Sequence, residues 1–388
     1  MDKRYLLAER TIDGDDLRDL TDWLKTDPWL TQGPLVKEFE RRWATWLGVK
    51  HATFVNSGSS ANLLMYAALL ASGKLRDKKV IVPAVSWATT VAPAIQLGFE
   101  PVMCEADWQT FGVDLNHLEQ LLKKHRPSAV IVVHVLGVPN DMAPLLDLKD
   151  RYGFLLMEDA CAATGSSYDG RHVGTFGDMS AFSFFYGHHL STIEGGAVCT
   201  DDEELHDLLL LLRSHGWPKD LAPEKEEEKA RARRAIEFNR RFTFYVPGFN
   251  VRSSDLNARI GLSQLSKIER VVSRRVENHG IYQARFLNAP GFHCQRNDRA
   301  AICSISFAAL ASSVEHRERI AAALQANRVE TRPVGGGNMS RQPYWADRYG
   351  TVDMPVADRI HTTGFQLPNH PGLMPEDIHH ICDIVLAK

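Results

Sequence analysis

The chain has 388 residues, of which 44% are hydrophobic and 24% charged, and its 45 basic and 48 acidic side chains give a net charge of −3. This length supports a large buried core and suggests two domains, and the near balance of charge argues against a nucleic-acid or membrane partner. The charged first residues do not resemble a signal peptide. No uncharged apolar run approaches the roughly 18 residues of a membrane span, so we expect a cytoplasmic protein.

Six cysteines are scattered along the chain without any Cys-X-X-Cys or Cys-X-Cys pair. This spacing argues against a zinc or iron–sulfur site, and we expect no bound metal. Cysteines in this pattern are typical of small buried side chains in a reducing compartment. They are Cys104, Cys161, Cys199, Cys294, Cys303 and Cys382.

Short apolar runs alternate with amphipathic stretches over the first 210 or so residues. Residues 80–82, 130–133 and 155–157 are rich in branched side chains, as buried parallel strands are, and residues 115–124 and 143–152 have helical periodicity. This alternation predicts an α/β fold with a mostly parallel sheet. Ligands on such sheets bind at the carboxyl ends of the strands, so candidate site residues are sought there.

The first candidate follows the apolar run that ends at Val55. Residues 56–62 (Asn-Ser-Gly-Ser-Ser-Ala-Asn) precede an apolar helical stretch. Small residues at a helix start, here Gly58 and Ser59, form a cradle for an anion. The same residues also fit an ordinary helix cap.

Two further candidates follow later strands. Trp87, in residues 83–90, comes after the run at 80–82 and is placed to stack on a planar ring, although a tryptophan there also fits the core. Asp159 ends the apolar run at 155–157, where it is placed to pair with a protonated pyridine nitrogen. A helix cap is the alternative interpretation of Asp159.

The fourth candidate is residues 181–197, in which Ser183 precedes a histidine pair, His188 and His189. Ser183 is suited to contact a phosphate. The turn at residues 194–196 (Glu-Gly-Gly) is expected to bring the backbone back to the site. A histidine pair in a loop also has a purely structural interpretation.

The pattern changes in the second half of the chain, most clearly beyond about residue 265. Residues 219–234 are densely charged and predict a solvated helix or mobile loop, and residues 264–286 predict one long charged helix. A mixed segment follows, so we expect a large domain over residues 1–250 and a smaller α+β domain over 251–388. Residues 332–339, with three glycines, predict either a substrate loop or a simple turn.

Taken in order, these motifs resemble the sugar aminotransferases and dehydratases that share the aspartate aminotransferase fold, pyridoxal phosphate (PLP) fold type I. The resemblance covers nearly the whole chain and implies a large domain with a mostly parallel seven-stranded sheet plus a smaller α+β C-terminal domain. The segments that carry it are residues 31–34, 39–40, 47–51, 57–62, His134, Gly137, 158–159, 174–177, Ser183, 194–196 and 247–252.

In that family the residue six positions before the glutamate of the Glu-Gly-Gly turn is the lysine that binds PLP as a Schiff base. Here that position holds His188, and the sequence has no lysine between Lys149 and Lys219. The resemblance therefore implies PLP or pyridoxamine phosphate (PMP) held without a covalent bond. It points to a small branch of sugar 3-dehydratases, with matches at residues 83–87, 139–141, 186–189 and 215–217. The iron–sulfur branch that also carries histidine is disfavoured by the scattered cysteines.

The resemblance implies a dehydratase that removes the C3 hydroxyl of a nucleotide-linked 4-keto-6-deoxy sugar, with L-glutamate regenerating PMP and a role in O-antigen or lipopolysaccharide sugar synthesis. His188 would act as the acid–base group, because an unperturbed imidazole titrates near pH 6.5 and offers both protonation states. One departure is Ala162, which stands where relatives carry glutamate or glutamine near the pyridine hydroxyl.

The same resemblance assigns the other site residues. They are Gly58, Ser59 and Ser183 at the cofactor phosphate, Trp87 on its ring, Asp159 at its nitrogen, Asn250 at the phosphate of the neighbouring subunit, and His215 at the sugar. A homodimer with a shared site follows from the role of Asn250. Two alternatives stay open: a keto-sugar aminotransferase that works without the lysine, and a non-catalytic PLP-binding protein.

Overall fold

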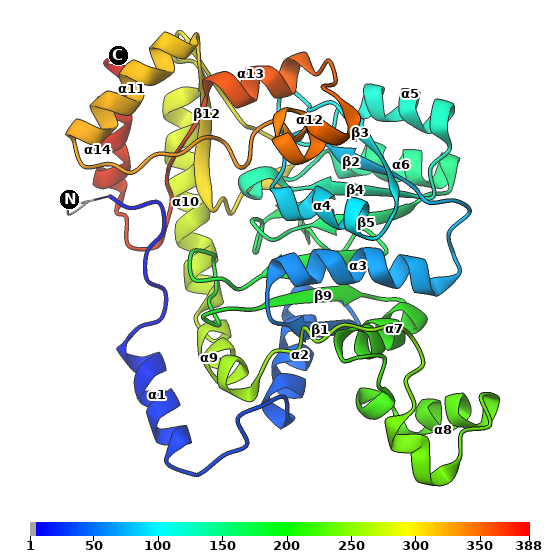
Figure 1. The fold of residues 1–388 in the computed structure, drawn as a ribbon. Helices are drawn as coiled ribbons and strands as arrows, with labels where there is room; N and C mark the ends of the chain where they lie inside the picture. Colours follow the sequence, from blue (N-terminus) through cyan, green and yellow to red (C-terminus); the bar gives the residue numbers. More distant parts are fainter. Residues whose placement is uncertain (1–4) are drawn as a thin grey trace.

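A seven-stranded sheet forms the centre of the computed structural model, which describes residues 5–388 (Figure 1). Every neighbouring pair is parallel except the two pairs made by β9, the last strand of this sheet in the sequence, which is antiparallel to both β1 and β8. The predicted α/β fold with a mostly parallel seven-stranded sheet is therefore confirmed. Across the sheet the strands are β1 (His51–Val55), β9 (Gly196–Thr200), β8 (Met179–Ser183), β5 (Leu155–Asp159), β4 (Ala129–Val133), β2 (Lys79–Pro83) and β3 (Glu100–Cys104).

Alternate residues of the central strands pack into two hydrophobic clusters, one on each face of the sheet. Val80 and Ile131 belong to the cluster that includes helices α3 (Gly58–Ser72) and α4 (Ala88–Gln96). Ile81 and Val130 belong to the cluster that includes α5 (Leu115–His125) and α6 (Met142–Tyr152). Strands buried on both faces read as continuous apolar runs, which is why β2, β4 and β5 were predictable.

Two more helices pack around β1. The helix α2 (Pro34–Leu47) buries Phe39 and Trp43 in a cluster with Phe54, and α7 (Glu203–Arg213) adds Leu209 to the α3 side. Short 3-10 turns η1 (Val135–Gly137) and η4 (Met339–Arg341) complete the loops near the sheet.

The C-terminal third forms a second, antiparallel sheet, as the predicted α+β region requires. Its strands are β10 (Phe292–Cys294), β12 (Ser306–Ala311) and β13 (Gly364–Pro368), and a small third sheet joins β11 (Ala300–Ala301), β6 (Ser167–Tyr168) and β7 (Arg171–His172). The associated helices are α9 (Asp255–Leu265), α10 (Ile268–Phe286), α11 (Val314–Ala326), α12 (Pro343–Tyr349), α13 (Pro355–Thr363) and α14 (Pro375–Leu386).

The single helix predicted over residues 264–286 is wrong at its start. The helix α9 ends at Leu265, and α10 begins only at Ile268. Gln264 is buried, and its amide donates hydrogen bonds to the Thr11 carbonyl at 3.0 Å and to Asp16 at 2.6 Å. These contacts with a distant part of the chain turn the backbone between the two helices.

The charged segment, residues 219–234, contains a helix, which is one of the two conformations predicted for it. The helix α8 (Pro223–Ala232) lies between η2 (Pro218–Asp220) and η3 (Glu237–Phe242) and projects from the body of the molecule (Figure 1). Its charges pair with one another along and beside the helix, for example Arg240 with Glu226 at 3.1 Å.

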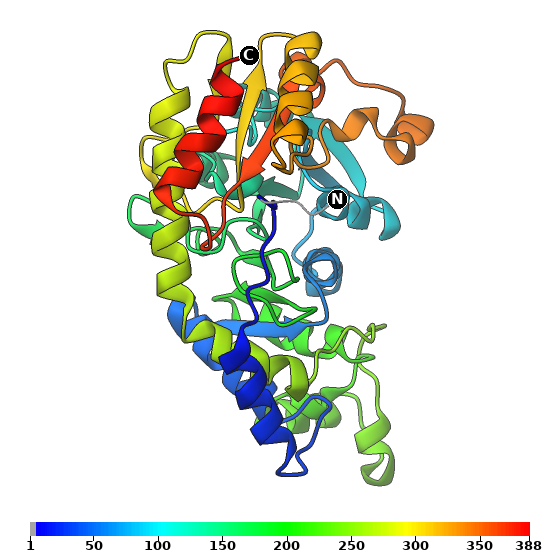
Figure 2. The same ribbon diagram turned by 90° about the vertical axis from the view of Figure 1, so that its left-hand side faces the viewer.

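The N-terminal segment runs from the C-terminal sheet to α1 (Gly14–Leu24) along one side of the molecule (Figure 2). Tyr5 pairs with Val329 in a parallel bridge, and Glu9 lies 2.9 Å from the ring of His370. Between them Ala8 reaches Gly187, where a Cβ atom would lie 3.4 Å from the alanine methyl. The segment therefore contacts the loop that carries His188.

No helix within residues 5–388 has both the length and the apolar character needed to cross a bilayer. In the same residues no cluster of His, Cys, Asp and Glu side chains is arranged to hold a metal ion. Five of the six cysteines are buried as predicted, and Cys161 is partly exposed beside the site described next.

Candidate active site

The predicted site residues that follow strands meet at one edge of the large sheet. Gly196, the first residue of β9, lies opposite Val55 of β1 on one side and Ser183 of β8 on the other. Asp159, at the end of β5, lies two strands further along beside Ala181. The carboxyl ends of β1, β8 and β5 therefore share an edge, as the alternation of strands and helices predicted.

The turn between β1 and α3 packs directly against Ser183. Ser57 caps the helix by accepting a hydrogen bond from the Ser60 amide at 3.1 Å. A Cβ atom on Gly58 would lie 2.6 Å from the Cβ of Ser183 and 3.0 Å from the sulfur of Cys161, so only glycine fits. Ser59 remains accessible and donates to the hydroxyl of Thr89 at 3.1 Å. The helix cap and the cradle are thus the same structure, with first-turn amides directed toward the sheet edge.

The Glu-Gly-Gly turn returns to this point, as predicted. A Cβ atom on Gly196 would lie 2.4 Å from the carbonyl oxygen of Ser57, so the two backbones are in contact. Thr192 and Asn257 both donate to the carbonyl of Glu194, at 2.9 and 3.2 Å. These bonds fix the turn beside the helix start.

Asp159 is buried and accepts three hydrogen bonds. Its Oδ2 accepts from Thr90 at 2.6 Å and from the Asn62 amide at 2.9 Å, and its Oδ1 accepts from the backbone N–H of Cys161 at 3.1 Å. The chain continues as turns rather than a helix, so the helix-cap alternative is wrong. The carboxylate is held rigidly and keeps acceptor capacity on Oδ1 for one more donor.

Asn62 and Thr90 lie within two of the sequence motifs, but the sequence alone predicts no role for either residue. Both are fully or almost fully buried. An asparagine inside the otherwise apolar start of α3 was the available signal, because a buried amide needs a partner. Thr90 gave no signal beyond its place near Trp87.

His188 is half-buried, and its Nδ1 lies 2.7 Å from the carbonyl oxygen of Cys161. A carbonyl only accepts, so Nδ1 carries the proton and Nε2 keeps a lone pair. Burial lowers the pKa of His188 to about 4. The sequence-based expectation of a pKa near 6.5 is therefore corrected by desolvation, and the ring is neutral at pH 7.

The second histidine of the pair has a different environment. His189 is fully buried, and its Nε2 donates to the carbonyl of Cys303 at 2.8 Å. Burial lowers the pKa of His189 well below its ordinary value. The structural interpretation thus applies to His189, whereas His188 lies at the partly accessible edge.

Trp87 is 61% exposed, so the interpretation of this residue as core is wrong. It precedes α4, and the glycine-rich segment predicted as a substrate loop or turn lies against it: the Gly336 amide donates to the carbonyl of Ser86 at 3.0 Å. The residues just before Trp87 are therefore held by a segment from the C-terminal part.

The acid before Asp159 has a structural role. Glu158 is fully buried and accepts from His134 at 3.0 Å and from the amides of Gly174, Phe176 and Gly177. Two segments used for the resemblance, His134 and residues 174–177, are thereby explained as supports of the sheet. Ala162 lies in the turn after β5, and its methyl group offers no hydrogen bond.

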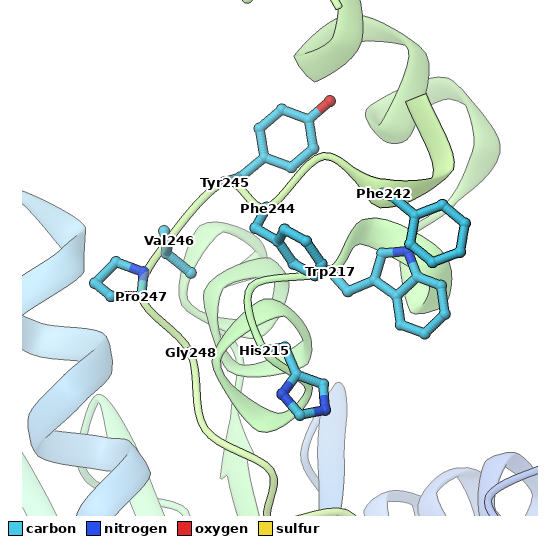
Figure 3. Close-up of a pocket in the computed structure, with 8 residues that line it drawn as sticks. All are labelled: His215, Trp217, Phe242, Phe244, Tyr245, Val246, Pro247 and Gly248. Atoms are coloured by element: carbon cyan, nitrogen blue, oxygen red, sulfur yellow. The ribbon is translucent and has the colours of Figure 1, made fainter. Parts of the chain in front are cut away.

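His215 and Asn250 lie on neighbouring segments, and Asn250 shares a cavity with residues of the sheet edge. Ser214 pairs with Asn250, and the His215 amide donates to the Phe249 carbonyl at 2.5 Å. Asn250 lines a cavity of about 250 Å³, and His215 lines one of about 750 Å³ (Figure 3). The smaller cavity also contains polar side chains from the end of β1 and the Glu-Gly-Gly turn, among them Asn56, Glu194, Arg252 and Asn257.

Comparison with known proteins gives consistent results. The DegT/DnrJ/EryC1/StrS aminotransferase family matches residues 10–386. A GDP-4-keto-6-deoxy-D-mannose 3-dehydratase of Escherichia coli O55:H7 is 34% identical over 388 residues, covering 98% of this chain and 99% of that protein.

Two solved structures of GDP-4-keto-6-deoxymannose 3-dehydratase are similar over 98% of this chain and 100% of theirs. A mutant with bound GDP-perosamine has a TM-score of 0.91 at 29% identity, and a form with a trapped PLP–glutamate geminal diamine has a TM-score of 0.89 at 29% identity. The resemblance found in the sequence motifs is confirmed. The chain belongs to the DegT/DnrJ/EryC1/StrS aminotransferase family, with a PLP fold type I architecture.

Proposed function

We propose that the protein is a PLP/PMP-dependent dehydratase that removes the C3 hydroxyl of a nucleotide-linked 4-keto-6-deoxy sugar. The observation that carries the proposal is His188, a neutral imidazole at the lysine position with its Nε2 lone pair free to take a proton. The relatives named as GDP-4-keto-6-deoxy-D-mannose 3-dehydratases support the substrate class.

The residues at the sheet edge fit the cofactor. Gly58 packs directly against Ser183, which places the start of α3 beside the end of β8, and the first-turn amides of α3 together with Ser59 and Ser183 suit a phosphate. Asp159, with acceptor capacity left on Oδ1, suits the pyridine nitrogen, and the exposed ring of Trp87 suits the face of the cofactor. When bound, the cofactor supplies an amino group for the 4-ketone and an aromatic ring that withdraws electrons.

In this proposal His188 moves the proton. Its Nε2 accepts a proton as elimination begins and returns one to the departing hydroxyl, which leaves as water. The Cys161 carbonyl holds the ring by accepting from Nδ1 and stabilises the imidazolium that forms. Proton transfer by a positioned group contributes typically 10²–10⁴-fold to the rate. Overall the sugar loses one oxygen atom, and L-glutamate becomes 2-oxoglutarate with release of ammonia.

The test is turnover of GDP-4-keto-6-deoxy-D-mannose with PLP and L-glutamate, read by product mass and ammonia. Loss of one oxygen atom with release of ammonia supports dehydration. A stable amino sugar would instead establish the second candidate, a keto-sugar aminotransferase, which the name of the matched family favours. No reaction of this or any related keto-sugar would favour the non-catalytic alternative.

The proposal includes a homodimer in which Asn250 of one subunit reaches the cofactor phosphate of the other. Asn250 is exposed, and large apolar side chains such as Trp29 and Phe242 are exposed as well, which supports a covered surface in the assembly. Mixing two inactive variants, His188→Asn and Asn250→Ala, should restore up to about a quarter of the activity, because half of the subunits pair as hybrids with one intact site. Absence of any recovery, with subunit exchange demonstrated, would contradict a shared site.

A further inference from the structure

One arginine of α10 is buried without a carboxylate to pair with it. Arg275 is 1% exposed, and within residues 5–388 no Asp or Glu side chain forms a salt bridge with its guanidinium. Its Nη1 donates instead to the backbone carbonyl oxygens of Ser304 at 3.4 Å, Ile305 at 3.1 Å and Asn369. Burial lowers the pKa of Arg275 to about 10, so the group is still charged at neutral pH. A buried cation held by carbonyl dipoles acts over a longer distance than an exposed one, because water does not screen it.

The carbonyls that hold Arg275 belong to the segment that anchors the histidine pair. The Cys303 carbonyl accepts from Nε2 of His189 at 2.8 Å, and the carbonyl of the next residue, Ser304, accepts from Arg275. His189 is buried, and its Nδ1 has no hydrogen-bond partner in the described part of the chain. Consecutive carbonyls of one segment therefore hold a ring of the pair and the guanidinium.

The charge of Arg275 acts on both rings of the pair. Burial is the main cause of the lowered pKa of His188 and of His189, and repulsion by Arg275 lowers the pKa of each ring further. For His188 the hydrogen bond to the Cys161 carbonyl and the charge of Asp159 oppose this effect. The ring of His188 thus feels a cation of α10 and a carboxylate at the sheet edge.

Most other titratable groups that face the guanidinium or the pair are uncharged at neutral pH. Burial raises the pKa of the two thiols and lowers the pKa of the two imidazoles among them, which are Cys161, Cys303, His279 and His370. Glu9, from the N-terminal segment, attracts the guanidinium, and its carboxylate lies 2.9 Å from His370. Because the Glu9 side chain is 46% exposed, water screens it, and it offsets only part of the charge of Arg275.

We propose that Arg275 is a positioning residue of the proposed reaction, which holds the 303–305 segment against the histidine pair and places an unpaired positive charge behind it. The inference rests on the proposed function for the statement that His188 moves a proton. A fixed cation disfavours a second positive charge nearby. It therefore keeps the resting His188 ring unprotonated and favours transfer of the proton from the imidazolium to the departing hydroxyl.

Carbon-13 NMR of the histidine rings tests the proposal on the full chain saturated with PLP, without substrate. The signal lost in His188→Asn identifies His188, and its chemical shift between pH 8 and pH 4 reports protonation. Two variants remove the charge: Arg275→Gln keeps amide donors for the carbonyls, and Arg275→Met fills similar space with an apolar chain. In both variants the midpoint of the His188 titration should move upward by about one pH unit.

Two further variants are controls. Arg275→Lys retains a positive charge and should leave the midpoint near the wild-type value of about 4. Arg274→Met removes the neighbouring arginine of α10, which pairs with Glu277 at 2.9 Å and is partly exposed, and this change should leave the midpoint where it was. Circular dichroism at each pH shows whether the variants are folded. In turnover, the fall of kcat/KM in acid should move together with the NMR midpoint.

An unchanged midpoint in the folded neutral variants would overturn the proposal. An equal shift in Arg275→Lys would assign the effect to lost hydrogen bonds instead of charge and would overturn it as well. A chain that folds only with a positive charge at this position has the same consequence, because the charge then serves the fold and not the base. A protein that shows the expected shift but releases no ammonia from a keto-sugar would keep the effect of Arg275 on the histidine pair while the proposed function fails.

Discussion

At the scale of single residues, the tautomer of His188 has a direct effect on pH dependence. Its Nδ1 donates to the Cys161 carbonyl, and burial lowers its pKa to about 4. A base with a lowered pKa is active above that pKa and is lost as the pH falls through it. His188 is therefore an unprotonated base at neutral pH and becomes protonated only in acid.

The titration of His188 should leave kcat/KM constant from pH 8 down to about 5 and should lower it as the pH approaches 4. Rates at saturating cofactor across this range measure it, with circular dichroism at each pH to exclude unfolding. His188→Asn should keep cofactor binding and lose at least about a hundredfold in rate. A half-loss near pH 6.5 in the folded enzyme would show that His188 titrates as an ordinary imidazole.

The donors to Asp159 give a second prediction. Thr90→Val and Asn62→Leu each remove one hydrogen bond to a buried carboxylate, which costs about 1–3 kcal/mol. Because the carboxylate is then less firmly placed for the pyridine nitrogen, PLP affinity should fall about tenfold, with a shifted absorbance band. Titration with PLP followed by absorbance measures both. Ser72→Ala, a change at the far end of α3, should leave the affinity and the band unchanged.

At the scale of elements, two glycines in helices should respond in opposite ways to alanine. Gly58→Ala places a methyl group 2.6 Å from the Cβ of Ser183, so it should destabilise the protein by about 1–3 kcal/mol and weaken the phosphate cradle. Gly280→Ala, within α10, meets no atom within 4 Å and should stabilise the protein by about 0.5–1 kcal/mol. Urea unfolding of both variants measures the difference, and a neutral Gly58→Ala would contradict the tight packing.

The sequence predicted the elements that pack locally and missed those that depend on distant contacts. The runs in β2, β4 and β5 and the turn at Gly58 follow from short patterns of branched or small side chains. The break between α9 and α10 depends on Gln264 reaching Asp16, almost 250 residues earlier, and no local pattern contains that contact. The pKa of His188 likewise depends on tertiary burial. The domain boundary at residue 250 stays a prediction.

At the scale of the whole molecule, buried histidines set the stability in acid. Burial lowers the pKa of His279 to about 4, and burial, reinforced by the nearby His51, lowers that of His206 to about 3. The unfolded chain binds protons to these rings near pH 6.5, whereas the folded chain does not, so stability is complete above pH 6.5 and falls as the pH drops toward 4.

We therefore expect the free energy of unfolding to decrease between pH 7 and pH 5 by up to roughly 2 kcal/mol for each such histidine. Urea unfolding at the two pH values measures it. His279→Gln should remove part of the difference, and His380→Gln, at an exposed position of α14, should not. Carboxylates held at low pKa, such as Asp13 at about 2, lose their contribution only below pH 4 and do not enter this range. A stability that is independent of pH here would contradict neutral buried rings.

The N-terminal segment links the residues after α11 to the loop of the proposed base, because Tyr5 pairs with Val329 and Ala8 touches Gly187. Proteolytic trimming up to residue 12 would thus free the loop from one side while leaving the large sheet intact. Preparations with ragged starts should differ in turnover, and those that lack the buried Tyr5 and Leu7 should also have a lower melting temperature. For purification, an affinity tag at the C-terminal end leaves these contacts of the N-terminal segment undisturbed.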